Sequence, residues 1–148
     1  MRVGEIQSLD VADVYEEATC AVRKAIYLDA ARTKWGHARS VFLNRTVQAA
    51  VTTHLQDRGL TPGPLIANQY AERFSRTGLV NLFRSLYRRA GLQTSSHTGR
   101  RLFIHSLADR GVSIRIIQEA VGHRSLQATN AYLSARPAEV AAAVELIR

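Results

Sequence analysis

The feature that most constrains the fold of this chain is a repeated pattern of helix starts and stops after residue 44. Asn or Ser side chains that can cap a helix precede apolar residues at helical spacing, and glycines follow the last turns. These signals predict six helices, over about residues 44–58, 75–90, 97–110, 113–121, 125–134 and 137–148. The side chains expected to face the core from the first three helices are Val47, Ala50, Val51 and Leu55, then Leu79, Leu82, Phe83, Leu86 and Ala90, then Phe103, Ile104 and Leu107.

The first 43 residues follow a different pattern. Val3, Ile6 and Leu9 have helical spacing with no N-cap residue before them, so we expect the end of a helix that is already under way at residue 1. From about Thr19 to Leu43, strand-like segments flank a polar turn with a glycine, which predicts a small antiparallel hairpin. The predicted fold class is therefore mainly α with a small antiparallel β-sheet (α+β).

Size and composition narrow the class of protein further. The chain has 148 residues, 46% hydrophobic and 22% charged, as expected for one globular domain. A single cysteine, Cys20, excludes a disulfide framework. No apolar run reaches the roughly 18 residues needed to span a bilayer, and the first residues do not form a signal peptide. We therefore expect a cytoplasmic protein with no membrane partner.

The distribution of charge favours a polyanionic partner. Lys and Arg number 20 against 12 Asp and Glu, a net charge of +8. Seven arginines and no acid lie between Arg73 and Arg101, and Lys24 and Lys34 are the only lysines. The planar fork of arginine can grip phosphate oxygens bidentately. A GC-rich genome would also raise the arginine content, so composition alone leaves both explanations open.

His97 and Arg100 form the first constellation with a chemical meaning. Residues three apart share one face of a helix, and here they lie at the N-terminal end of a predicted helix. Backbone N–H groups and the helix dipole favour an anion at that end. The pair can therefore cradle a phosphate, and the alternative is two solvated polar residues.

Further motifs accompany this pair. Gly122-His123 comes 23 residues after Arg100, and Tyr132 lies nine residues beyond His123. With His97-x-x-Arg100 they resemble the C-terminal signature of the tyrosine recombinases, the phage-integrase family. Residues 111–125 (GVSIRIIQEAVGHRS) are similar to the family's segment between its HxxR motif and its nucleophile. Residues 33–43 (TKWGHARSVFL) resemble its hairpin with the catalytic lysine, and residues 2–9 (RVGEIQSL) the segment with its first arginine.

This resemblance covers residues 1 to about 135 and matches all six of the family's catalytic positions. The matching residues are Arg2, Lys34, His97, Arg100, His123 and Tyr132. It implies a tyrosine recombinase catalytic-domain fold, partial in this chain. It also implies a site-specific DNA recombinase or integrase that cleaves and rejoins strands through a 3′-phosphotyrosyl intermediate.

The resemblance also implies a role for each residue. Tyr132 would be the nucleophile, with His97 as its candidate base, and Lys34 would protonate the departing 5′-oxygen. The negative charge on the pentacoordinate phosphorus would be stabilised by guanidinium and imidazole donors. Those donors would be Arg2, Arg100, His97 and His123. Glu5, one turn after Arg2, would orient that arginine.

The partner expected from the resemblance is double-stranded DNA, bound by a homo-tetramer that the C-terminal helix (138–147) links, in the prokaryotic cytoplasm and associated with the nucleoid. The arginines expected to contact DNA are Arg39, Arg73, Arg76, Arg101 and Arg124. We expect no cofactor and no small-molecule substrate, because the covalent link conserves the bond energy. The remaining histidines (His37, His54 and His105) lack metal-ligand spacing, so no metal site is predicted.

Two departures from the family leave alternatives open. Many members carry a bulky residue before the arginine of HxxR and a histidine after it, where this chain has Gly99 and Arg101. Residues 1–148 are also expected to be a single C-terminal catalytic domain without the family's N-terminal core-binding domain. The chain is then either a fragment or a truncated, inactive integrase remnant. A non-enzymatic helix-turn-helix module over 113–134, with Arg124 and Gln127 at the recognition helix, is the other alternative.

Overall fold

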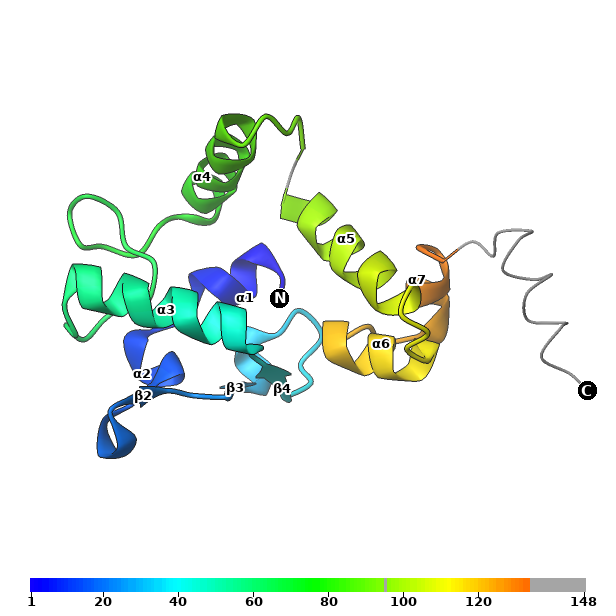
Figure 1. Ribbon diagram of the computed structural model, residues 1–148, viewed down its shortest axis with the longest axis horizontal. Helices are drawn as coiled ribbons and strands as arrows, with labels where there is room; N and C mark the ends of the chain where they lie inside the picture. Colours follow the sequence, from blue (N-terminus) through cyan, green and yellow to red (C-terminus); the bar gives the residue numbers. More distant parts are fainter. Residues whose placement is uncertain (95, 134–148) are drawn as a thin grey trace, which may run out of the picture. The chain divides into compact units, whose positions relative to one another are not determined.

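The computed structural model describes residues 1–94 and 96–133 (Figure 1). The chain divides into two compact units. The first unit is Met1–Arg100, and the second begins at Arg101. The predicted helix over 137–148 lies outside the described residues. None of the helices within the described part of the chain is long and apolar enough to cross a membrane.

Two short helices begin the first unit, α1 (Val3–Gln7) and α2 (Val11–Val14). The expectation of a helix already under way at residue 1 is wrong, because α1 has its own start. Arg2 has extended backbone angles as the N-cap, and its backbone N–H donates to Oε2 of Glu5 at 2.6 Å. An acid three residues after the N-cap thus satisfies a donor that would otherwise lack a partner. Asp13 does the same for the backbone of Asp10 at 2.7 Å.

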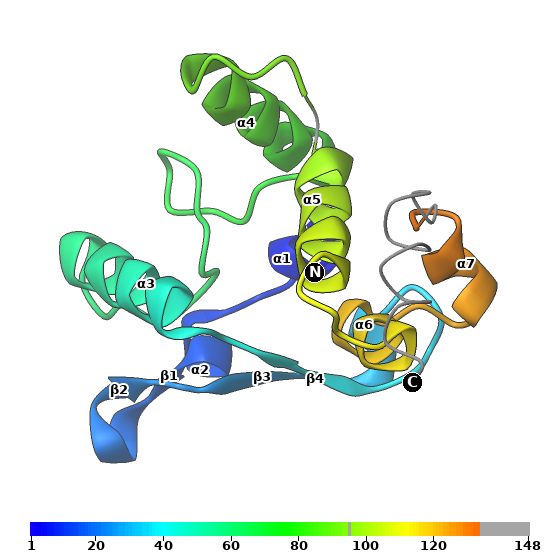
Figure 2. The same cartoon turned by 45° about the vertical axis from the view of Figure 1, so that its right-hand side comes forward.

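Two antiparallel hairpins follow, where the sequence predicts one (Figure 2). The first pairs β1 (Tyr15–Glu16) with β2 (Ala21–Val22) across the 3-10 turn η1 (Glu17–Thr19). The predicted hairpin is the second, β3 (Ala25–Leu28) paired with β4 (Arg39–Phe42), with the 3-10 turn η2 (Ala30–Arg32) and Gly36 in its connection. Ile26 and Leu28 point into the core from β3, as strand alternation requires.

The helices predicted after residue 44 are present as far as the structure describes the chain. They are α3 (Arg45–Arg58), α4 (Arg76–Arg89), α5 (Ser96–Ala108), α6 (Ile114–Val121) and α7 (Leu126–Asn130). Asn44 caps α3 by accepting the backbone N–H of Val47 at 2.9 Å, and Ser75 caps α4 at 3.0 Å. Gly59 and Gly122 follow α3 and α6 with positive φ angles, which glycine adopts without steric cost.

Each unit has its own apolar core. The core of the first is formed by Leu9, Val11, Val14, Ile26, Leu28, Leu55 and Leu65, and that of the second by Ile104, Ile117 and Val121. Five of the predicted core positions are wrong. The three large side chains among them, Val47, Leu86 and Phe103, are 42%, 48% and 49% exposed. The first two lie two turns from buried Leu55 and Leu79, where their helices extend past the core, and Phe103 lies beside the buried face of α5. Ala50 and Ala90 are exposed too.

Candidate active site

The Glu5 carboxylate is the buried centre of the N-terminal part of the candidate site. Glu5 is 2% exposed, and acids are rarely so buried unless they are paired. Arg2 donates to it from its backbone nitrogen at 2.6 Å and from Nη1 at 3.1 Å. Arg39 adds a bidentate pair, from Nη1 at 3.0 Å and Nη2 at 2.8 Å. Burial alone would raise the pKa of Glu5, but these hydrogen bonds outweigh it and lower the pKa from 4.5 to about 2.

Glu5 therefore remains ionised and holds two guanidinium groups at once. This is the geometry that an orienting role toward Arg2 requires. The two arginines carry one positive charge more than the carboxylate neutralises, so the cluster keeps a net positive charge that suits a phosphate. The side chain of Arg2 is 24% exposed and that of Arg39 is 14% exposed.

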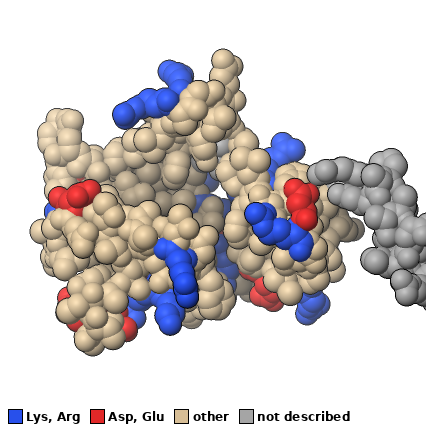
Figure 3. All heavy atoms as spheres, viewed as in Figure 1, with Lys and Arg blue, Asp and Glu red and all other residues tan. Residues whose placement is uncertain are grey.

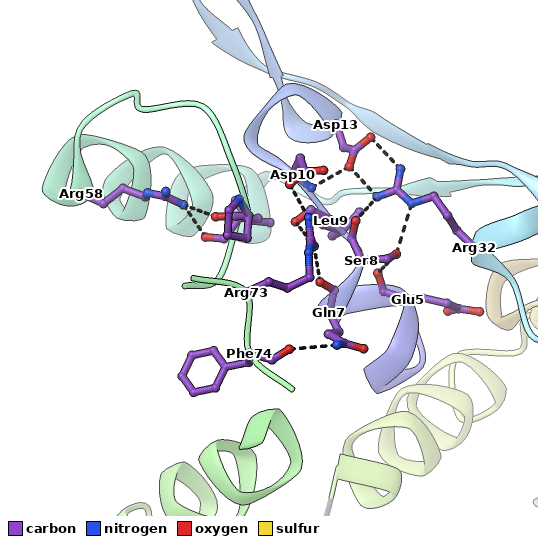
Figure 4. A network of polar contacts seen from close by, with 12 residues as sticks. Glu5, Gln7, Ser8, Leu9, Asp10, Asp13, Arg32, Arg58, Arg73 and Phe74 are labelled. Carbon is purple, nitrogen blue, oxygen red and sulfur yellow. Dashed lines mark hydrogen bonds and ion pairs between the residues drawn. The ribbon is translucent and has the colours of Figure 1, made fainter. Parts of the chain in front are cut away.

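Arginines also fix both ends of the loop that carries Lys34. Before the loop, the fork of Arg32 donates to both carboxylate oxygens of Asp13, at 2.8 and 2.6 Å, and to the carbonyl of Ser8 at 2.5 Å (Figure 4). After the loop, Arg39 is held by its carboxylate partner. The segment 33–38 is thus a short connection between two anchored residues. Sequence reasoning missed Arg32, because its partners are about 20 residues away along the chain.

Lys34 and His97 are both exposed. Nζ of Lys34 lies 5.0 Å from the ring centroid of Trp35, a cation–π contact. His97 lies in the first turn of α5, where the helix N-terminus favours an anion. Arg100, one turn further on, is half-buried. Burial lowers the pKa of the Met1 ammonium and the positive charge of Arg100 lowers it further, so within the first unit Arg100 and the start of the chain share one electrostatic environment.

In the second unit, the turn after α6 places His123. Gly122 has φ 66° and ψ 51°, and the His123 N–H donates to the carbonyl of Gln118 at 3.1 Å. The Gln118 amide donates back to the His123 carbonyl at 3.1 Å. Nδ1 of His123 lies 3.0 Å from Oγ1 of Thr129, which is fully buried. Because a threonine hydroxyl can donate or accept, Thr129 can hold the His123 ring in one orientation in either tautomer.

Tyr132 follows α7 and lies directly beside this histidine. The rings of Tyr132 and His123 are stacked, with centroids 5.8 Å apart and an interplanar angle of 21°. The guanidinium carbon of Arg101 lies 5.8 Å from the Tyr132 ring centroid. One side of the half-buried ring packs on the core of the second unit. The Tyr132 phenol thus lies close to one imidazole and one guanidinium, both of which can donate hydrogen bonds to an anion.

The six predicted catalytic residues are divided between the units. Four of them lie in the first unit (Arg2, Lys34, His97 and Arg100) and two in the second (His123 and Tyr132). Within the first unit the structure links Arg2 to Glu5 and Arg39, and within the second it links Tyr132 to His123. The roles predicted for the six stay predictions.

Two of the arginines predicted to contact DNA are engaged within the chain. Arg73 donates to the Gln7 carbonyl and to the Asp10 carboxylate at 2.5 Å (Figure 4). Arg39 is held by Glu5 as described above. Of the predicted set, Arg39 is half-buried, and the exposed members are Arg73, Arg76, Arg101 and Arg124. The structure thus gives Arg39 and Arg73 a role within the first unit, and a DNA contact by either stays a prediction.

The sequence reasoning also missed a basic cavity of about 700 Å³ between the end of α4 and the start of α5. It is lined by Arg84, Arg88, Leu92, Gln93, Thr94 and Thr98. Within the described residues neither arginine forms an ion pair, although like charges four apart on a helix repel each other. Basic side chains are visible over α4 at the top of Figure 3. The sequence signal that could have revealed this cavity is the four-residue spacing of Arg84 and Arg88 within the stretch 73–101, which has no acidic residue.

No group of three or more His, Cys, Asp or Glu side chains that could hold a metal ion occurs among the residues that the structure describes.

Solved structures identify the fold. The crystal structure of XerA recombinase has a TM-score of 0.75 and 24% identity to this chain, covering 99% of it and 51% of that chain. The Tn1549 transposon integrase in complex with circular intermediate DNA has a TM-score of 0.73, 19% identity and coverages of 100% and 56%. XerH site-specific recombinase bound to difH substrate has a TM-score of 0.71 and 23% identity, and the match covers 97% of this chain and 42% of that chain. The fold is that of a tyrosine recombinase catalytic domain, and the predicted fold class is confirmed.

Sequence comparison assigns the family. The model of the phage integrase family matches residues 1–139, and the chain belongs to this family. Tyrosine recombinase XerA of Pyrococcus furiosus is 26% identical over 149 residues, covering 98% of this chain and 49% of the relative. XerA of Pyrococcus horikoshii is 27% identical, with coverages of 98% and 50%. Tyrosine recombinase XerC of Syntrophus aciditrophicus is 37% identical over 73 residues, with coverages of 48% and 24%. The chain spans about half the length of the XerA relatives it matches.

Proposed function

We propose that this chain is the catalytic part of a site-specific DNA recombinase that cuts and rejoins strands through a covalent link to Tyr132. The observation that carries the proposal is the stacking of Tyr132 on His123, at 5.8 Å between ring centroids, with Arg101 beside the same ring. The family match supports it, because both residues stand where the resemblance expects the nucleophile and one of its phosphate-binding partners.

The chemistry is a pair of transesterifications at one phosphodiester. The Tyr132 oxygen attacks phosphorus and gives its proton to a base, for which His97 is the candidate. The bond to the 5′-oxygen breaks, Lys34 protonates that oxygen, and the DNA 3′-phosphate stays attached to the tyrosine. In the second step, a 5′-hydroxyl of the partner strand attacks the phosphotyrosine and releases the phenol. Each step makes and breaks one P–O bond, so neither step requires an energy source.

The positive groups act on the charge that develops at phosphorus. Arg2, Arg100 and His123 donate to the non-bridging oxygens, where preorganised donors lower the barrier most. Glu5 fixes the guanidinium of Arg2 before substrate arrives, because it is buried and doubly bonded to that residue. Arg39 also donates two hydrogen bonds to the Glu5 carboxylate, which helps to keep it ionised.

Double-stranded DNA is the proposed partner. The Tn1549 integrase is described in complex with circular intermediate DNA and XerH as bound to its difH substrate, and this chain has a net charge of +8. Arg76, Arg101 and Arg124 are exposed for contacts with backbone phosphates. The cavity beside Arg84 and Arg88 has donors suited to one more phosphate. Assembly into a homo-tetramer through the C-terminal helix belongs to this proposal and rests on the resemblance alone.

Trapping of a covalent adduct tests the proposal. The full chain is incubated with a randomised pool of nicked duplexes, which samples many target sequences and from which a cleaved strand end diffuses away. We expect denaturation-resistant protein–DNA adducts with the wild type, none with Tyr132→Phe, and normal yield with the control Tyr70→Phe, whose side chain is 73% exposed. Reversible binding without any adduct would refute the proposal and favour an inactive remnant or a helix-turn-helix regulator.

A further inference from the structure

Gly99 stands inside the HxxR motif, where many members of the family carry a bulky residue. Its backbone is helical rather than left-handed, so its conformation does not require glycine. Space does. A Cβ atom on Gly99 would collide with the hydroxyl oxygen of Tyr87, whereas Cβ atoms on Gly4 or Gly91 would meet nothing within 4 Å. Glycine is a poor helix former, so its use here indicates a packing requirement.

Tyr87 comes from the last turn of α4 and is half-buried. Its carbonyl accepts the N–H of Leu92 at 2.8 Å, which closes the end of that helix. The start of its side chain is thus fixed by a capped helix end, and its hydroxyl lies over the backbone of α5 between His97 and Arg100. The phenol fills the space that a larger residue at position 99 would occupy.

We propose that Tyr87 is a positioning residue for the HxxR motif, and that Gly99 leaves the space that the Tyr87 hydroxyl occupies. Contact at Gly99 sets the distance between the first turn of α5 and α4. That turn carries both His97 and Arg100, so any displacement moves both side chains together. The inference rests on the proposed function, in which these two side chains act at the reacting phosphate.

A double-mutant cycle on Gly99 and Tyr87 tests whether the two residues are in contact. Gly99→Ala introduces the collision. Tyr87→Phe removes the hydroxyl, after which the nearest ring atom to the new methyl group is Cζ at 3.7 Å, an ordinary van der Waals distance. The double variant is therefore expected to fit where the single Gly99→Ala variant does not. Gly4→Ala, also within a helix but in open space, is the matched control.

The measured quantity is the rate of adduct formation on the nicked duplexes, together with reversible DNA affinity. We expect Gly99→Ala to slow adduct formation by about 10- to 100-fold, as small displacements of catalytic groups do, with an unchanged dissociation constant. Tyr87→Phe should slow adduct formation about three- to tenfold, because it removes the contact that positions the first turn of α5. The double variant, in which the new methyl group meets Cζ at 3.7 Å, and Gly4→Ala should remain within about threefold of the wild type. Wild-type rates for Gly99→Ala, or a double variant as slow as Gly99→Ala, would overturn the inference.

Thermal unfolding of the same proteins separates this inference from the proposed function. Gly99→Ala should lower the melting temperature only when Tyr87 is present, whether or not the chain cleaves DNA. If the wild type forms no adduct, the proposed function and the positioning role fail while the coupled melting temperatures still report the contact. If the wild type is active and the melting temperatures are additive, the contact itself is refuted.

Discussion

Replacement of Glu5 by glutamine tests the buried cluster most sharply, because one nearly isosteric change removes the charge that holds Arg2 and Arg39. The pKa of Glu5 falls from 4.5 to about 2 on folding. By linkage, this lowering of the pKa corresponds to roughly 3 kcal/mol of stabilisation by the ionised form. Breaking a buried ion pair by removal of one partner costs about 3–5 kcal/mol in other proteins. We therefore expect Glu5→Gln to lose about 3 kcal/mol at pH 7.

The lowered pKa of Glu5 also predicts how the stability difference between wild type and Glu5→Gln changes with pH. Because the folded-state pKa is the lower one, the stabilisation is complete above pH 4.5 and is lost as the pH falls toward 2. The stability difference between wild type and Glu5→Gln should therefore be large at neutral pH and shrink below pH 4.5. Urea unfolding at several pH values measures it, followed by fluorescence of Trp35, the only tryptophan, which lies in the first unit.

Glu17→Gln is the matched control, since this acid is exposed and its charge should contribute little. The stabilising role of the Glu5 charge is refuted if Glu5→Gln unfolds within about 0.5 kcal/mol of the wild type. It is equally refuted if the difference between the two proteins is the same at pH 7 and pH 3.

Three further expectations concern DNA binding and chemistry. Replacing Arg84 and Arg88 together by glutamine should weaken DNA binding without sequence preference and reduce the slope of log affinity against log salt by about 1, measured by fluorescence anisotropy; an unchanged slope would exclude a phosphate in that cavity. Thr129→Val should slow adduct formation about 10-fold or more by removing the hydrogen bond that orients the His123 ring, while Thr129→Ser retains the rate; equal rates for both would exclude this role. Adduct yield should be the same with and without a chelator, and a loss that added Mg²⁺ restores would show that the mechanism is incomplete.

Local signals predicted much of the helical fold. Asn44 and Ser75 cap α3 and α4 as expected, and Gly122 ends α6, because caps and left-handed glycines depend on neighbouring residues only. The start of α1 carries only half of such a signal, since Glu5 stands three residues after Arg2 but arginine is not an N-cap residue. Exposure was harder to predict. Phe103 and Leu86 are apolar and helical, but how far each core extends along a helix is a tertiary property.

In the candidate site too, local features were predictable and tertiary contacts were not. The spacing of His123 and Tyr132 is visible in the sequence, and their ring stacking agrees with it. The partner of the histidine, Thr129, was not predicted, because a buried threonine on a short helix has no distinctive pattern. The link between Arg39 and Glu5 joins residues 34 positions apart, which one sequence cannot reveal. Gly99 was noticed as a departure, but only the structure supplies its partner.

The central claim is that Tyr132 becomes covalently attached to DNA through a 3′-phosphate, and mass spectrometry of a trapped adduct tests it most directly. After nuclease and protease digestion, the account predicts a nucleotide mass on the peptide that contains Tyr132, with a free 5′-hydroxyl on the released strand. Attachment to another residue, a 5′-linked nucleotide, or unmodified peptide from a reaction that has cleaved its DNA would contradict the account.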